Sequence, residues 1–197
     1  MYKNSWAEMS FNKKELEAHK SQVVHGRPYA QRVSLGFAIN LDRVEDPFSI
    51  ISEVDYLEGI RHTTKTKPEA PFKPPLYPFW HKHFSTARHI PKNLAVRWAL
   101  DKGGNADLEN ILQSITESHG DQEHVWQNYL VDALITNGYK ERAARGLTGD
   151  WIIYGKHDGQ NYYIGLATHE EAAGKNAETL LKRLRQSAYA EFPFLFD

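Results

Sequence analysis

The chain has 197 residues and contains no cysteine. This absence excludes disulfide bonds, thiol nucleophiles and thiolate metal ligands, so any metal would have to be held by histidine and carboxylate side chains. We expect neither a cofactor nor a bound metal, and a histidine-based metal site is the minor alternative. The lack of cysteine also fits a reducing compartment, so we expect a cytoplasmic protein.

Long apolar runs are missing as well. No stretch approaches the about 18 apolar residues that a membrane-spanning helix requires, and the N-terminal sequence MYKNSWAEMSFNKKELEAHK lacks the apolar region of a signal peptide. The motifs G-x-x-x-x-G-K-[ST], G-x-G-x-x-G, G-x-S-x-G and H-E-x-x-H are also absent, so triphosphate-binding, dinucleotide-binding, serine hydrolase and zincin chemistry have no support. We therefore expect a soluble protein without a membrane partner.

Net charge is low, at −1, but the charges are unevenly distributed. The segment from Ile60 to Trp98, here called the basic segment, holds eight of the 24 Lys and Arg residues, which run from Arg61 to Arg97, and one acidic residue, Glu69. It also holds four of the ten histidines. Such asymmetry within one chain indicates an anionic partner.

Apolar residues recur at helical spacing in six segments, several of which begin at a capping residue or end at glycine. Ser10 or Asn12 can cap the first of them. Asn137 and Gly138 are expected to close the fifth. The predicted helices are residues 13–24, 47–58, 92–102, 108–115, 121–136 and 177–190, and a loop or frayed helix is expected at 139–146.

Alternating apolar and polar residues predict strands. The alternation is clearest at 32–41, where Val33, Leu35, Phe37, Ile39 and Leu41 share one side. Further strands are expected at 60–66, on an edge, and at 79–84, after a proline-rich extended loop at 68–78. Two strands around an Asp-Gly turn predict a hairpin at about 150–168.

These elements are not in regular strand-helix-strand order. The sequence therefore predicts a single α+β domain over residues 1–197, in which a small antiparallel sheet packs against a layer of about five or six helices. The apolar C-terminal sequence EFPFLFD is expected to dock on the core.

The basic segment also holds the best candidate site. In a strand, His81 and His83 project from one face with β-carbons about 7 Å apart, while Lys82 faces away. Histidine titrates near neutral pH and Lys and Arg stay cationic, so this set can supply an acid, a base and charge stabilisation for phosphodiester cleavage. The predicted catalytic residues are His81, His83, His62, Lys82 and Arg88.

Aromatic side chains alternate with these charges, and aromatic rings stack on unpaired bases. This favours single-stranded RNA, or another anionic ligand, over duplex DNA. The predicted substrate-binding residues are Lys65, Trp80, Phe84, His89 and His169, the last of which follows the second hairpin strand. The competing interpretation is that these histidines and aromatics are surface or core residues without chemistry.

Two functions from different classes follow from this pattern. The first is a protein that binds RNA or another phosphate-bearing ligand, and that acts as a metal-independent endoribonuclease. The second is a non-catalytic interaction module, whose basic segment meets an acidic protein partner or a second copy of the chain in a homo-oligomer.

Overall fold

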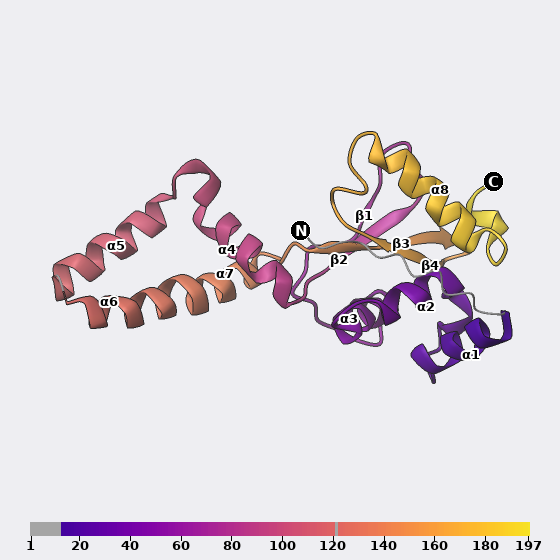
Figure 1. Cartoon of the computed structure of the whole chain (residues 1–197), viewed down its shortest axis with the longest axis horizontal. Coiled ribbons are helices and arrows are strands. Elements are labelled where there is room, and N and C mark those ends of the chain that lie inside the picture. The colour runs from indigo at the N-terminus through magenta and orange to yellow at the C-terminus, as the bar shows by residue number, and fades with distance from the viewer. Residues whose placement is uncertain (1–12, 121) are drawn as a thin grey trace.

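Figure 1 shows the computed structural model, which describes residues 13–120 and 122–197. Its strands form one antiparallel sheet in the order β1-β2-β3-β4. They are β1 (Ala70–Pro71), β2 (Trp80–Phe84), β3 (Asp150–His157) and β4 (Gln160–Ala167). The α+β class and the antiparallel sheet are therefore confirmed. The hairpin of β3 and β4 is confirmed too, and Asp158 and Gly159 form its turn with positive φ angles of 48° and 73°.

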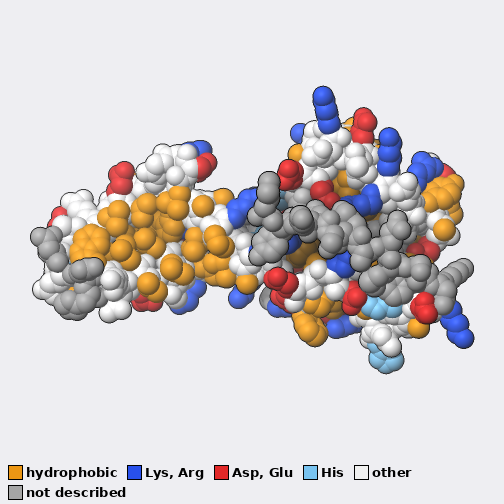
Figure 2. Space-filling view, viewed as in Figure 1, with side chains coloured by type: hydrophobic (Ala, Val, Ile, Leu, Met, Phe, Trp, Pro, Cys, Tyr) orange, Lys and Arg blue, Asp and Glu red, His pale blue; other side chains and the backbone are white. Residues whose placement is uncertain are grey.

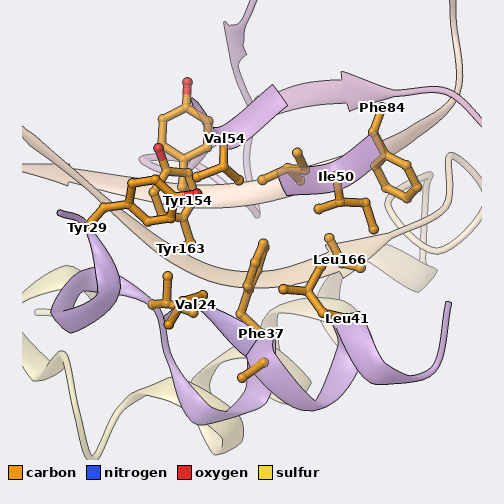
Figure 3. Close-up of a cluster of buried hydrophobic side chains, with 13 residues drawn as sticks. Val24, Tyr29, Phe37, Leu41, Ile50, Val54, Phe84, Tyr154, Tyr163 and Leu166 are labelled. Carbon is orange, nitrogen blue, oxygen red and sulfur yellow. The ribbon is translucent and has the colours of Figure 1, made fainter. Parts of the chain in front are cut away.

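Helices cover both faces of the sheet. On one face lie α2 (Leu35–Asp42) and α3 (Pro47–Leu57), and α1 (Lys13–Val23) packs against α2. Figure 3 shows side chains from these helices and the sheet pointing into one apolar cluster. The fully buried members of this cluster include Tyr29, Phe37, Leu41, Ile50, Val54, Ile152, Tyr154 and Tyr163.

On the opposite face lies α8 (Asn176–Ala188), which buries Leu180 and Leu184 against the sheet. Glycine lets the two layers approach closely, because a β-carbon at Gly165 would lie 2.7 Å from Leu184 Cδ2. The C-terminal residues dock on the same face, since Leu195 is buried and sits over Gly155. The predicted docking of the C-terminus is thus confirmed.

The strand predicted at 32–41 is wrong, because most of this segment forms α2. Its apolar residues at 33, 37 and 41 fit both a strand alternation and a helical i, i+4 spacing, so the pattern alone did not distinguish them. Ser34 favours the helix over the strand, because its side chain caps α2 by accepting a hydrogen bond from the Phe37 N–H at 3.0 Å.

The strand predicted at 60–66 is also wrong. This segment is irregular, and Thr66 forms only an isolated bridge with Leu147. The predicted short strand at 79–84 is confirmed as β2, and the proline-rich loop before it contributes only the edge strand β1.

Among the helices, those predicted near 13–24, 47–58 and 177–190 are confirmed as α1, α3 and α8. The two suggested caps of the first helix, Ser10 and Asn12, lie outside the described residues. Downstream of the basic segment the structure contains α4 (Ile90–Trp98), α5 (Ala106–His119), α6 (Glu123–Leu130), the π-helical η4 (Val131–Asn137) and α7 (Gly138–Ala144).

The helix predicted to stop at Asn137 and Gly138 instead continues through them, from α6 into η4 and α7. Gly138 is needed for packing, because a β-carbon there would lie 2.7 Å from the Trp98 ring. The segment 139–146, expected to be a loop or a frayed helix, therefore mostly belongs to α7.

The helices α4 to α7 project away from the sheet as an arm, residues 90–144, that forms the left half of Figure 1. The expected packing of these helices on the sheet is wrong, since both faces are already covered by α2, α3 and α8. In the arm α4 packs against α7, and Arg97 pairs with Glu141 at 2.5 Å and with Asp107 at 2.9 Å. None of the described helices is long and apolar enough to cross a membrane.

One glycine gives a direct test of the β2–β3 packing. A β-carbon at Gly149 would lie 1.8 Å from the Phe84 carbonyl oxygen, which is backbone and cannot move aside cheaply. We expect Gly149→Ala to destabilise the fold by about 2 kcal/mol or more, measured by urea unfolding. Gly165→Ala is the matched control, because its nearest neighbour is the mobile end of Leu184, and a larger loss in the control would contradict this account.

Candidate functional site

Strand β2 places two of the predicted catalytic histidines on the α8 side of the sheet. His83 lies opposite Trp151 of β3, and His81 lies opposite Ile153. Because side chains alternate along a strand, Lys82 points to the α2 and α3 side. The predicted arrangement of His81 and His83 on one face is therefore present.

His169, which follows β4, completes a compact group with them. Its ring stacks on His83 with centroids 5.2 Å apart and an interplanar angle of 27°, and it lies 4.3 Å from the Trp151 ring. His81 contacts the same indole at 4.6 Å. We call His81, His83, Trp151 and His169 the histidine cluster.

Hydrogen bonds hold one ring of the cluster in a defined state. His83 Nδ1 lies 3.2 Å from the Gly149 carbonyl oxygen, and its Nε2 lies 3.4 Å from the Trp151 indole nitrogen. The indole N–H only donates, so Nε2 accepts, while Nδ1 faces both the Gly149 carbonyl oxygen and, at 3.4 Å, the Gly149 N–H. Both nitrogens of His83 are engaged, which makes it a positioning residue rather than a free acid or base.

The other two rings are less constrained. His81 Nδ1 is buried and has no hydrogen-bond partner among the described residues. The His169 ring is half-buried and is held by ring contacts alone within the described part of the chain. Neither of these two rings therefore has a nitrogen committed to a hydrogen bond with the described residues.

The electrostatic surroundings of the cluster favour neutral histidines in the free protein. Burial lowers the pKa of both His81 and His83 from 6.5 to about 4. Burial also lowers the pKa of His169, and the cations of Lys92 and Lys67 lower it further. Both lysines are exposed, and neither forms an ion pair among residues 13–120 and 122–197. A bound anion would offset this positive field.

Two further predicted residues lie beside the cluster in a separate network around Asp150. His89 is buried, accepts a hydrogen bond from the Thr86 N–H through Nδ1 at 2.9 Å, and places Nε2 3.6 Å from the Asp150 carboxylate. Burial lowers the pKa of His89. Arg88 is exposed and forms an ion pair with the same carboxylate.

This network opens onto a cavity of about 220 Å³ at the end of the sheet. Three arginines line it, and two of them are paired, Arg88 with Asp150 and Arg183 with Glu171. Arg43 is the third. The cavity wall includes Thr168, the residue before His169, so it adjoins the histidine cluster.

Lys82 does not join the histidines. Its side chain is fully buried, and its Nζ lies 2.9 Å from Glu53, donates to the Lys67 carbonyl oxygen at 2.8 Å and contacts the Thr66 hydroxyl. Burial lowers the pKa of Lys82, and Glu53 raises it. The contacts of this predicted catalytic residue are those of a structural ion pair.

The remaining predicted residues are dispersed. His62 and Lys65 are exposed in the irregular segment before β1, and neither side chain contacts the cluster. Phe84 is buried in the core shown in Figure 3. Trp80 is half-buried, with the Lys156 ammonium 3.8 Å from its ring centroid.

Four residues of the site were not singled out from the sequence: Lys67, Lys92, Gly149 and Trp151. Trp151 belongs to the correctly predicted hairpin of β3 and β4. The pairing of β3 with β2, which brings Trp151 next to His83, was not predicted. The two lysines were counted only as part of the basic segment. Their proximity to His169 depends on how the end of β4 meets α4, which carries Lys92, and the segment before β1, which carries Lys67, and the local sequence does not encode this.

The arrangement of the rings does not suit a metal ion. Stacked imidazoles direct their nitrogens in parallel rather than toward one point. Across residues 13–120 and 122–197, no group of three or more His, Asp or Glu side chains is placed to hold a metal.

Comparison with known proteins gives no assignment. No family, no curated protein and no solved structure matches this chain.

The ion pair of Lys82 gives the first prediction for this region. Lys82→Met should destabilise the fold by about 3–5 kcal/mol, because it leaves the buried Glu53 carboxylate without its cation. The double variant Lys82→Met with Glu53→Gln should recover most of this loss in urea unfolding. Equal destabilisation of the single and double variants would show that the two side chains are not coupled.

The low pKa values of His81 and His83 give a second prediction, on pH. The unfolded chain takes up protons near pH 6.5, whereas the folded protein holds these rings neutral to about pH 4. The unfolded state therefore binds more protons in this window, and stability falls as pH decreases from 6.5 to 4, by up to about 1.4 kcal/mol per pH unit for each histidine.

Urea unfolding at a series of pH values measures this slope. The double variant His81→Gln with His83→Gln should flatten it between pH 6.5 and 4. The exposed His62→Gln should leave it unchanged. An unaltered slope in the double variant would mean that other groups carry the pH dependence.

Proposed function

We propose that the protein binds single-stranded RNA, or another phosphate-bearing ligand, at the histidine cluster, and that it cleaves RNA there without a metal. The observation that carries the proposal is the convergence of His81, His83 and His169 around one indole, beside two lysines without a counter-ion among the described residues. Cationic side chains bind phosphate, and an aromatic face binds an unpaired base.

The neutral state of the histidines supports this role. A phosphate near His81 or His169 would favour the protonated form, so anion binding and proton uptake are linked at this site. Lys67 and Lys92 supply fixed positive charge next to His169, which favours the charge that develops on phosphorus during cleavage. His83 orients Trp151 and is itself held in place by the Gly149 backbone.

Cleavage would proceed by internal displacement. The 2′-oxygen forms a bond to phosphorus while one neutral imidazole takes its proton, and the bond from phosphorus to the 5′-oxygen breaks as a second, protonated imidazole donates a proton to that oxygen. The products are a 2′,3′-cyclic phosphate and a 5′-hydroxyl. His81 and His169 are the candidates for these two roles, because their nitrogens are not committed to the described part of the protein.

The second candidate function is a non-catalytic module that binds an acidic protein through the basic segment. Six of the eight Lys and Arg side chains of this segment are exposed, the exceptions being Lys82 and Arg97. This charged surface supports electrostatic association with or without chemistry.

Fluorescently labelled single-stranded RNA tests the main proposal. Binding measured by anisotropy should weaken as salt increases, because Lys and Arg side chains that neutralise phosphates release counter-ions from the RNA. Lys67→Ala with Lys92→Ala should lower both the affinity and the salt slope, by about 0.7 for each phosphate that is no longer neutralised. RNA that does not bind at low salt would remove the proposal.

Cleavage is tested with the same RNA in the presence of EDTA. His169→Ala should reduce the cleavage rate by about 10²-fold or more without changing the circular dichroism spectrum, while His62→Ala, an exposed histidine of the same segment, should have no effect. Cleavage should also increase as pH falls from 8 toward 5, because the acid needs a protonated imidazole and its pKa is lowered. Binding without cleavage would leave only the binding half of the proposal.

A further inference from the structure

Five of the ten exposed large apolar side chains of the described residues lie in the arm. Its large apolar side chains are about half exposed at Val96 (52%), Leu100 (54%), Tyr129 (48%), Val131 (54%) and Ile135 (49%). Figure 2 shows hydrophobic side chains in a continuous band along the arm, which is the left half of that view. Contiguous apolar patches of this kind mark interaction surfaces.

The arm cannot bury this surface by itself. Among its described residues, Trp98 and Ile115 are the large apolar side chains that are buried. Two helices side by side bury only their shared seam, whereas four helices surround a core. The helix hairpin of α5 with α6 and η4 is therefore half of a bundle.

We propose that the missing half is the arm of a second copy of this chain, and that two arms pack as a four-helix bundle. The sequence along the exposed helix supports a like partner, because residues 125–139 (VWQNYLVDALITNGY) contain a single charged residue, Asp132. A nearly uncharged face meets its own copy without like-charge repulsion. A strongly basic or acidic partner would find little charge to pair with there.

The exposed face of the arm is large enough for a dimer interface. Two helices about 10 Å wide and up to about 33 Å long present a face on the order of 600 Å² in projection, which approaches the about 800 Å² that each partner contributes to a standard interface. The proposed dimer is independent of RNA binding, because the exposed residues that carry it lie outside the histidine cluster.

Light scattering coupled to size exclusion tests the proposal with the full chain. We expect a mass of two chains of 22.7 kDa at about 50 μM protein, and the same mass in about 1 M salt, because apolar contacts are not screened. A mass of 22.7 kDa at all concentrations would overturn the proposal. Dissociation by salt would also overturn it, in favour of charge pairing through the basic segment.

Charge substitutions locate the interface. Val131→Lys with Ile135→Lys should give a folded monomer, because both side chains are half exposed. Val96→Lys with Leu100→Lys, on α4 and just after it, is the second variant if the first loses helicity. The control, Asn110→Lys with Ser114→Lys, adds the same two charges at exposed polar positions of α5, on the side opposite its apolar positions 108, 111, 112 and 115, and should stay dimeric. A dimer that survives both apolar variants would place the interface elsewhere and overturn the proposal.

Discussion

The position of strand β2 depends on the ion pair between Lys82 and Glu53. Strand β2 lies between β1 and β3 in a sheet that is covered on both sides, and the side chain of Lys82 on it is buried completely. Glu53 on α3 neutralises the Lys82 cation. The Thr66 hydroxyl and the Lys67 carbonyl oxygen accept hydrogen bonds from its other N–H groups. The pair links the basic segment to α3. With Lys82 facing α3, the neighbouring histidines lie on the opposite face of the sheet.

This position on the α8 face explains the lowered pKa values and the ring contacts of the histidine cluster. With His81 and His83 on the α8 face, burial depresses their pKa values, and the rings of Trp151 and His169 pack against them. The Gly149 carbonyl oxygen and the indole N–H then use both nitrogens of His83. What is left is a neutral, aromatic surface flanked by two lysines that form no ion pair with the described residues, and this is the surface that we propose for a phosphate-bearing ligand.

The same covering of the sheet explains the arm. Because α2, α3 and α8 occupy both faces, the helices between β2 and β3 have no sheet surface to pack on. They pack on each other instead, through Arg97, Glu141 and the contact of Trp98 with Gly138. Their second apolar face is left exposed, and Lys92, near the start of α4, places one cation of the arm beside His169 of the histidine cluster.

The sequence by itself determined the local elements whose signals agree: the hairpin around Asp158 and Gly159, the helix α3 with Asp46 as its N-cap and Pro47 at its first position, the apolar stripe of α8, and the side-by-side placement of His81 and His83. The strand predicted at residues 32–41 was wrong, because one set of apolar positions fits both the strand and the helix period. Ser34, together with packing on the sheet, selects the helix. Tertiary structure alone decided that His169 and Trp151 join the cluster, that His62 does not, and that the helices after β2 leave the sheet. The reason is physical: periodicity reports which side of an element is buried, whereas the choice of partner depends on which surfaces of the rest of the chain are already covered.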